Sequence, residues 1–354
     1  MTRHTRTEPF AALPALDRRK FTLGAMLALT AACNGGAQSR DPARGTSRML
    51  TWTAYRDTYL MADGRIIDTG NKGVSHSEGQ SYGLIFAYNA NDRDSFERIA
   101  RWTQEQLSRK DIALHCWRYD PAAADPVADK NNATDGDLVI AWALHLAGKR
   151  WNRPDYIARA AEIRAAIRSH CVIERYGRHL LLPGLEGFVT GGGVTLNPSY
   201  FVWPALDAFA RIDGAGVWGP VIDDCAQLLG LARFGARHLP CDWMTISGPA
   251  QLAPASDKPP RFGYDAIRVP LYAALGNRKV LAADIAAYWR ACLAGGRPIP
   301  AWVDVVTGEE ANYALSNGGA AVAGLLLGTA QPAALDNDYY AASLQLLAKL
   351  PTGL

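Results

Sequence analysis

Residues 133–144 read ATDGDLVIAWAL, in which two acidic residues lead into an apolar run of helical length. From Leu138 onward the run is apolar on nearly every side, so the helix that it predicts must be covered all round. Three further segments share this character, namely residues 81–90, 266–275 and 318–328. The stretch therefore predicts one of several fully buried helices.

A second kind of segment is amphipathic. Residues 94–107 and 155–167 place apolar side chains on one stripe and charges opposite, which is typical of surface helices. Buried and amphipathic helices in alternation predict an all-α fold, an α/α barrel in which an outer ring of helices wraps an inner ring. We expect ten to twelve helices, and one small β-hairpin over residues 172–182 that turns at Tyr176 and Gly177.

Three acidic residues that are far apart in the chain open segments of the buried kind. They are Glu78, Asp135 and Asp265. If the N-terminal ends of neighbouring buried helices meet, these carboxylates share one cleft. Two carboxyls that face each other are the minimal equipment for cleaving a glycosidic bond, so the pattern predicts a glycoside hydrolase.

Helix capping is the alternative explanation for two of these acids. The motifs SEGQ (residues 77–80) and TDGD (residues 134–137) resemble capping boxes, in which Glu78 and Asp135 would be first-turn acids favoured by the helix dipole. In both motifs a glycine follows the acid, although glycine is unfavourable at a helix start. Close approach of a ligand to the backbone would explain the glycines, so we favour the functional interpretation.

The third acid has a basic neighbour at helical spacing. Arg268 follows Asp265 by three residues, which places the guanidinium and the carboxylate on the same helical face. We expect this pairing to keep Asp265 ionised, as a general base must be.

These motifs carry a resemblance to a known family. SEGQSYG (77–83), ATDGDLVIAWAL (133–144) and YDAIRV (264–269) resemble glycoside hydrolase family 8, and within it the endoglucanases encoded with bacterial cellulose synthases. The similarity extends over most of the chain through shorter matches, which are ND (91–92), LPG (182–184), LNPSY (196–200) and DW (242–243). It implies an (α/α)6 barrel, hydrolysis of β-1,4-glucan with inversion, and no cofactor.

The resemblance also implies roles for the acids. Glu78 would be the general acid, Asp265 the base that activates water, and Asp135 a ligand that distorts the sugar at the cleavage point. A helix dipole lowers the pKa of a carboxyl, so Glu78 needs a counter-effect from desolvation or from an ionised Asp135. An inverting mechanism requires the two working carboxyls about 6.5–9.5 Å apart.

Substrate-binding residues are expected beside these acids, because a β-glucan offers flat apolar faces and a rim of hydroxyls. By resemblance, Trp117 would stack on a sugar and Tyr200 would lie near the attacking water. We also expect Arg268, Asp137 and Tyr264 to contact the substrate. Ordinary core packing is an equal alternative for some aromatic candidates, namely Trp203, Trp243 and Tyr264.

The N-terminus predicts export. Residues 17–23 read DRRKFTL and place a twin arginine before an apolar stretch that is too short to span a bilayer. We expect a twin-arginine signal peptide over residues 1–33, a flexible linker over 34–47 and a catalytic domain over 48–354, in the periplasm or secreted. Cys33 follows LTAA, which resembles a lipoprotein cleavage box, so a lipid anchor at Cys33 is an alternative.

Charge and composition exclude several partners. Beyond residue 33 the chain holds 32 Lys/Arg and 32 Asp/Glu, so its net charge is zero. Binding to nucleic acid requires an excess of clustered positive charge, so we expect no nucleic-acid partner. The seven histidines lack ligand spacing, so we expect no metal site, and the cysteines are expected to be mostly buried rather than paired. We expect no transmembrane span in the mature protein.

The partner implied by the resemblance is a β-1,4-glucan chain, with the bacterial cellulose synthase complex as a further candidate. Two alternatives to a cellulase stay open. One is another family 8 specificity, for xylan, chitosan or mixed-linkage glucan. The other is a non-catalytic glucan-binding subunit of an export machine, against which stands the presence of all three acids.

Overall fold

The computed structural model describes residues 49–354. The predicted signal peptide, Cys33 and the predicted linker lie outside this range. Within it, eleven α-helices make up most of the regular structure: α1 (Trp52–Tyr59), α2 (Ser77–Asn89), α3 (Arg93–Leu107), α4 (Thr134–Trp151), α5 (Pro154–Ala166), α6 (Trp203–Asp213), α7 (Ala215–Leu231), α8 (Arg268–Leu275), α9 (Ala283–Ala294), α10 (Asn317–Leu327) and α11 (Tyr339–Leu347).

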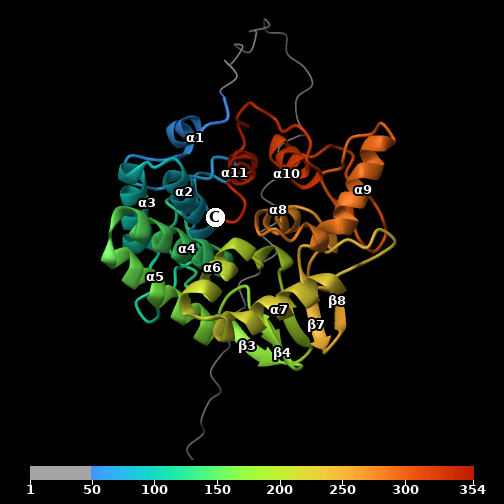
Figure 1. The fold of residues 1–354 in the computed structure, drawn as a ribbon, viewed down its shortest axis with the longest axis horizontal. Coiled ribbons are helices and arrows are strands. Elements are labelled where there is room, and N and C mark those ends of the chain that lie inside the picture. The colour runs from blue at the N-terminus through green and yellow to red at the C-terminus, as the bar shows by residue number, and fades with distance from the viewer. Residues whose placement is uncertain (1–48) are drawn as a thin grey trace, which may run out of the picture. The chain divides into compact units, whose positions relative to one another are not determined.

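Six of these helices form a closed inner ring. Each of them contacts the next, in the order α2, α4, α6, α8, α10 and α11, and α11 contacts α2 again. Figure 1 shows the other five, α1, α3, α5, α7 and α9, outside that ring. The four segments that the sequence marks as apolar all round lie in α2, α4, α8 and α10, all of which belong to the ring. The predicted all-α (α/α)6 barrel is therefore confirmed.

Helix boundaries follow local signals. Asn152 closes α4 in the left-handed conformation, with φ of 52°, and Pro154 opens α5 at a position where its missing N–H costs nothing. Gly328 ends α10 with φ of 72°. The inner helix α4 and the outer helix α5 thus form an antiparallel pair joined by a very short turn.

The predicted hairpin is present. Strands β3 (Val172–Arg175) and β4 (Arg178–Leu181) pair antiparallel, and Val172 lies opposite Leu181. Tyr176 and Gly177 turn between them with φ of 56° and 70°, the positive values that a two-residue hairpin turn requires.

Further short strands were not predicted. A four-stranded sheet runs in the order β5 (Val189–Thr190), β6 (Gly193–Leu196), β7 (Met244–Gly248) and β8 (Gln251–Pro254). Two smaller antiparallel pairs join β1 (Ser75–His76) to β2 (Arg118–Tyr119) and β9 (Arg261–Phe262) to β10 (Val303–Asp304). Strands of two to five residues are too short to show a period of two in the sequence.

These strands have a common position along the chain. β1 leads into the first turn of α2, β6 precedes the short 3-10 helix Pro198–Tyr200, β7 follows Trp243 and β9 precedes Gly263. Each of these segments contributes to the polar cluster described below. The small sheets therefore fix the loops at the end of the barrel where the inner helices begin.

The expectation of buried cysteines is met within residues 49–354. The five cysteines in this range are buried and unpaired. No helix there is long and apolar enough to cross a membrane.

Candidate active site

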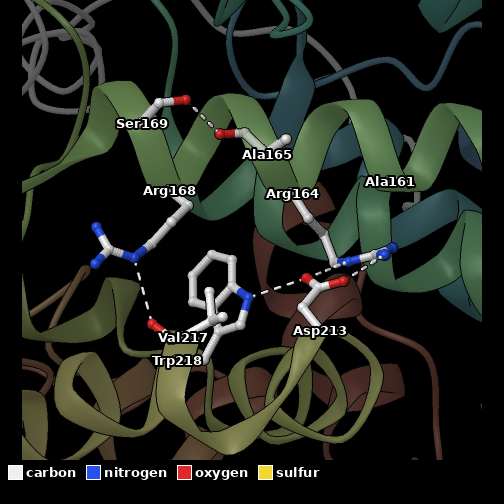
Figure 2. Close-up of a pocket in the computed structure, with 8 residues that line it drawn as sticks. All are labelled: Ala161, Arg164, Ala165, Arg168, Ser169, Asp213, Val217 and Trp218. Atoms are coloured by element: carbon white, nitrogen blue, oxygen red, sulfur yellow. Dashed lines mark hydrogen bonds and ion pairs between the residues drawn. The ribbon is translucent and has the colours of Figure 1, made fainter.

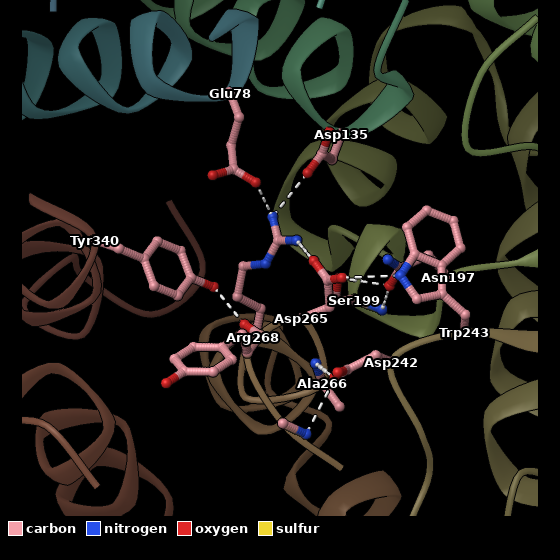
Figure 3. A network of polar contacts seen from close by, with 12 residues as sticks. Glu78, Asp135, Asn197, Ser199, Asp242, Trp243, Asp265, Ala266, Arg268 and Tyr340 are labelled. Carbon is pink, nitrogen blue, oxygen red and sulfur yellow. Dashed lines mark hydrogen bonds and ion pairs between the residues drawn. The ribbon is translucent and has the colours of Figure 1, made fainter. Parts of the chain in front are cut away.

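One arginine brings the three predicted acids together (Figure 3). Glu78 is the second residue of α2, Asp135 the second residue of α4, and Arg268 the first residue of α8. Arg268 Nη1 pairs with Glu78 Oε2 and, at 2.7 Å, with Asp135 Oδ2, while Nη2 lies 2.7 Å from Asp265 Oδ1. The predicted meeting of the three carboxylates is confirmed.

Glu78 and Asp135 do lie in the first turns of α2 and α4, but neither motif forms a capping box. The N-caps of α2 and α4 are His76 and Ala133, and neither makes a side-chain capping bond. Gln80, the last residue of the first supposed box, instead accepts from Ile66 N at 2.6 Å. Capping therefore does not explain Glu78.

The glycines beside the acids serve helix packing rather than ligand approach, which corrects our expectation. A Cβ added to Gly136 would lie 2.6 Å from Ser77 Oγ and 2.9 Å from Glu78 N. A Cβ on Gly79 would collide with the Tyr339 hydroxyl. Because only glycine leaves this space, the first turn of α4 reaches the first turn of α2, and their acids face one cation.

Asp265 does not open a helix, as the sequence suggested, but lies in a turn three residues before α8. The Asp265 carboxylate is held at both oxygens, by Arg268 at Oδ1 and by Trp243 Nε1 at Oδ2, 3.1 Å away. Asp242 Oδ1 accepts from the backbone N–H groups of Gly263 at 3.0 Å and Ala266 at 2.7 Å. Sequence reasoning missed the role of Asp242, because its partners lie more than twenty residues away.

Burial dominates the ionisation of Glu78. It raises the pKa, Arg268 opposes it, and the charges of Asp135 and Asp265 raise the pKa again, to about 8. Desolvation and Asp135 are the counter-effects that the sequence required against the helix dipole, and that expectation is confirmed. The Glu78 side chain is still 22% exposed, so an external ligand can reach it.

Asp265 behaves differently from our expectation. Burial raises its pKa above the ordinary value, and Arg268 lowers it without cancelling that effect. The charge of Asp135 raises it further, while the hydrogen bonds from Arg268 and Trp243 lower it. Arg268 thus favours the ionised form of Asp265, as predicted, but the net shift is upward.

Arg268 stays charged at the centre of this cluster. Its side chain is only 2% exposed, and its neighbouring carboxylates outweigh burial, so its pKa lies well above the usual range. The Tyr82 hydroxyl lies 3.3 Å from Nη1, and the Tyr200 ring lies 5.6 Å from the guanidinium carbon. One fixed cation therefore faces three carboxyls and cannot neutralise them all.

The sequence model described as "Glycosyl hydrolases family 8" matches residues 13–353. The chain belongs to glycosyl hydrolase family 8. The resemblance noted from the motifs is therefore confirmed.

Two curated relatives carry endoglucanase names. The endoglucanase of Cellulomonas uda is 40% identical over 78% of this chain and 77% of that protein. The probable endoglucanase of Novacetimonas hansenii is 41% identical over 84% of this chain and 88% of that protein. Among solved structures, the endo-β-1,4-glucanase of Acetobacter xylinum superposes with a TM-score of 0.81 at 39% identity, and covers 86% of this chain and 98% of that chain.

The predicted aromatic residues lie around the acids of this family 8 site. Trp117 is partly buried beside the start of α2, where its carbonyl accepts from Ser77 N at 3.0 Å and its ring lies parallel to His76. Tyr200 ends a short 3-10 helix, Pro198–Tyr200, next to Arg268. Tyr264 is 57% exposed and precedes Asp265 directly.

Asp137 lies elsewhere. It is fully buried, with Oδ1 bonded to the backbone N–H of His115 at 3.0 Å and to its Nδ1 at 2.8 Å, and with Oδ2 bonded to Asn132 at 3.0 Å. Both oxygens are occupied inside the protein, so a sugar has no route to them. We therefore do not retain Asp137 among the proposed substrate ligands.

Tyr340 joins the site without any prediction from the sequence. It is the second residue of α11, and its hydroxyl donates to the Tyr264 carbonyl at 2.7 Å (Figure 3). It thereby ties the last inner helix to the turn that carries Asp265. Nothing in the local sequence around Tyr340 distinguishes it from a core residue.

A surface pocket of about 410 Å³ lies apart from this cluster, between α5 with the π-helical turn Ile167–Cys171 and the ends of α6 and α7 (Figure 2). Its buried cation, Arg164, is paired through Nε and Nη2 with both oxygens of Asp213, each at 2.8 Å. That pair is neutral and leaves no surplus acid. Within residues 49–354 no group of His, Cys, Asp and Glu side chains is arranged to hold a metal ion.

Proposed function

We propose that this protein is an endo-β-1,4-glucanase that hydrolyses glucan chains with inversion at the anomeric carbon. The observation that carries the proposal is the cluster of Glu78, Asp135 and Asp265 around Arg268. Membership of family 8 and the names of its endoglucanase relatives support it.

Glu78 is the proposed general acid. Its pKa of about 8 means that the carboxyl carries a proton at neutral pH and can deliver it to the leaving glycosidic oxygen. Once Glu78 has lost that proton, Arg268 stabilises the carboxylate that remains. The same contact thus limits how far burial can raise the pKa.

Asp265 is the proposed base that removes a proton from the attacking water. Arg268 and Trp243 each hold one of its oxygens, so the carboxylate has a fixed orientation. The side chain is 32% exposed, which leaves it accessible to water. An inverting enzyme needs room for that water, so we expect Glu78 and Asp265 to be about 6.5–9.5 Å apart when substrate is bound.

Asp135 is the proposed ligand of the sugar at the cleavage point. It is only 2% exposed and shares Arg268 Nη1 with Glu78, so any group that contacts it must enter the cluster. Trp117, Tyr200 and Tyr264 are the proposed aromatic contacts, because sugar rings present apolar faces to such side chains.

We also propose that a twin-arginine signal exports the protein to the periplasm or out of the cell. A lipid anchor at Cys33 is the alternative form of this proposal. Association with the bacterial cellulose synthase complex is likewise proposed. Both rest on the motifs of the sequence.

Hydrolysis assays test the activity. Purified protein is incubated with carboxymethylcellulose, xylan, chitosan and mixed-linkage β-glucan, and NMR follows the anomeric protons of fresh products. We expect the fastest cleavage on carboxymethylcellulose, with the α-anomer formed first. Faster cleavage of another polysaccharide would replace the cellulase assignment with that specificity, a β-anomer would contradict inversion, and binding without cleavage would favour a non-catalytic subunit.

A further inference from the structure

Asp242 is a partly buried carboxyl that none of the proposed steps uses. It follows Cys241 and immediately precedes Trp243, and its backbone N–H donates to the Arg261 carbonyl at 2.7 Å. Its side chain reaches further along the same segment, where Oδ1 accepts from Gly263 N at 3.0 Å and Ala266 N at 2.7 Å. Asp242 thus holds residues 261–266 at three backbone positions.

The segment held in this way carries two members of the active cluster. Asp265 lies between the two anchored N–H groups, and Arg268 follows after two further residues. Two backbone hydrogen bonds within the segment link Asp265 and Arg268 to the anchored turn. Ile267 N donates to Gly263 O and Arg268 N donates to Asp265 O, each at 3.0 Å. A displacement of the Gly263–Ala266 backbone would therefore move the base and the cation together.

The fit around the Asp242 carboxyl is close. A Cβ on Gly263 would lie 3.0 Å from Asp242 Oδ2, so an alanine there would force the turn or the carboxyl to shift. Two N–H donors converging on one oxygen are the arrangement that caps a helix, but here the acceptor comes from a residue more than twenty positions away.

We propose that Asp242 is a positioning residue for the base: its Oδ1 anchors the backbone turn that carries Asp265 and Arg268, so that both side chains meet Glu78 and Asp135. This inference rests on the proposed function. Asp242 touches neither sugar nor water in the reaction and acts only through Asp265 and Arg268.

The charge of Asp242 is not what the anchor needs. Burial and the neighbouring Asp265 carboxylate raise its pKa to about 7, so at pH 5.5 the carboxyl is mostly protonated. An asparagine keeps an acceptor oxygen of the same shape and resembles that neutral form. The acceptor and the charge can therefore be separated by substitution.

The experiment compares Asp242→Ala and Asp242→Asn on carboxymethylcellulose at pH 5.5. We expect Asp242→Ala to lower kcat by about 100-fold with little change in KM, because misplacement of a catalytic group by about 1 Å costs that much. Asp242→Asn should retain kcat within about threefold of the wild type. An Asp242→Asn variant as impaired as Asp242→Ala would overturn the anchoring role, since the acceptor would then not be what matters.

Gly263→Ala tests the same anchor without removing the carboxyl. Its new methyl group would push the turn away from Asp242, and we expect a kcat about 3- to 10-fold lower in a stably folded protein. If both Asp242→Ala and Gly263→Ala keep kcat within twofold, the proposal fails. Should Asp242→Ala not fold, Gly263→Ala and Asp242→Asn still decide it.

Asp92→Ala is the matched control. Asp92 Oδ1 accepts from Ser95 N at 3.1 Å and Oδ2 accepts from Trp52 Nε1 at 2.9 Å, at the start of the outer helix α3. This variant should lose stability without losing kcat, which separates anchoring in general from anchoring of the base.

Wild-type protein that cleaves no β-glucan would contradict the proposed function and this role together, whereas active wild type with unchanged variants would contradict only the role of Asp242.

Discussion

Two buried arginines in this protein both pair with carboxylates, but they differ in how many carboxylates they face. Arg164 faces one carboxylate, Asp213, with two bonds of 2.8 Å (Figure 2). Arg268 faces three, Glu78, Asp135 and Asp265 (Figure 3). Burial tends to raise the pKa of Asp213, yet the hydrogen bonds from Arg164 and Trp218 outweigh it, and the pKa falls below the ordinary value.

The difference lies in the ratio of acids to cations. When one carboxylate pairs with one guanidinium, the two charges balance and the carboxylate stays ionised. The Arg164–Asp213 pair therefore stabilises the packing of α5 against α6 and α7. When three carboxyls share one guanidinium, burial wins, and the pKa values of Glu78 and Asp265 rise. A surplus of acid around a fixed cation is thus what allows one carboxyl to hold a proton at neutral pH.

Substitution of the proposed acid should give the largest effect. Glu78→Gln keeps the shape of the side chain but cannot deliver a proton, so we expect kcat on carboxymethylcellulose to fall by roughly 10³-fold, with polysaccharide binding retained. Reducing-sugar release and affinity electrophoresis measure the two quantities.

Asp213→Asn is the control for that substitution. It changes a carboxyl to an amide beside the other buried arginine, and kcat should stay within about twofold of the wild type, because this pair contacts no part of the proposed site. If Glu78→Gln kept its turnover, Glu78 would not be the general acid, and the two clusters would not differ in function.

Breaking the balanced pair should instead cost stability. Asp213→Ala leaves Arg164 buried without its partner, and we expect the free energy of unfolding to fall by about 3 kcal/mol, toward the lower end of the range for buried pairs, since solvent reaches part of Asp213. Urea denaturation gives the value.

The double variant Arg164→Met with Asp213→Leu should recover part of that loss, because apolar side chains of similar volume avoid the unpaired charge. Specific activity per folded molecule should be unchanged in both proteins. If Asp213→Ala were as stable as the wild type, the pair would not contribute to packing as the comparison requires.

The sequence predicted the parts of this contrast that have a local signature. The apolar run from Leu138 marks an inner helix, and Tyr176 and Gly177 mark a hairpin turn, because helical period and turn chemistry are properties of neighbouring residues. The three acids could be found because each begins such a run or lies just before one.

Other features depend on contacts between distant residues and left no local signal. Asp242 holds a turn more than twenty positions ahead, Gly136 is required by Ser77 on another helix, and Asp137 turns inward to His115 although its motif resembles a sugar-binding one. The upward shift of the Asp265 pKa likewise follows from burial within the assembled barrel, whereas its arginine partner three residues away is visible in the sequence.

A last expected effect is on the pH dependence of stability, and its sign differs between the two clusters. The pKa of Glu78 is raised from 4.5 to about 8 on folding, so its contribution is fully present below about pH 4.5 and is lost as the pH rises through 8. The pKa of Asp213 is lowered, so its contribution is present above the ordinary 3.8 and is lost as the pH falls through the folded value.

Urea denaturation in steps from pH 3 to 9 measures both contributions. Glu78→Gln should flatten the decline between pH 5 and 8 by at most about 1.4 kcal/mol per pH unit, and Asp213→Asn should flatten only the acidic side. If Glu78→Gln and the wild type gave the same slope above pH 5, Glu78 would not carry the extra proton, and the surplus of acid around Arg268 would have no consequence for ionisation.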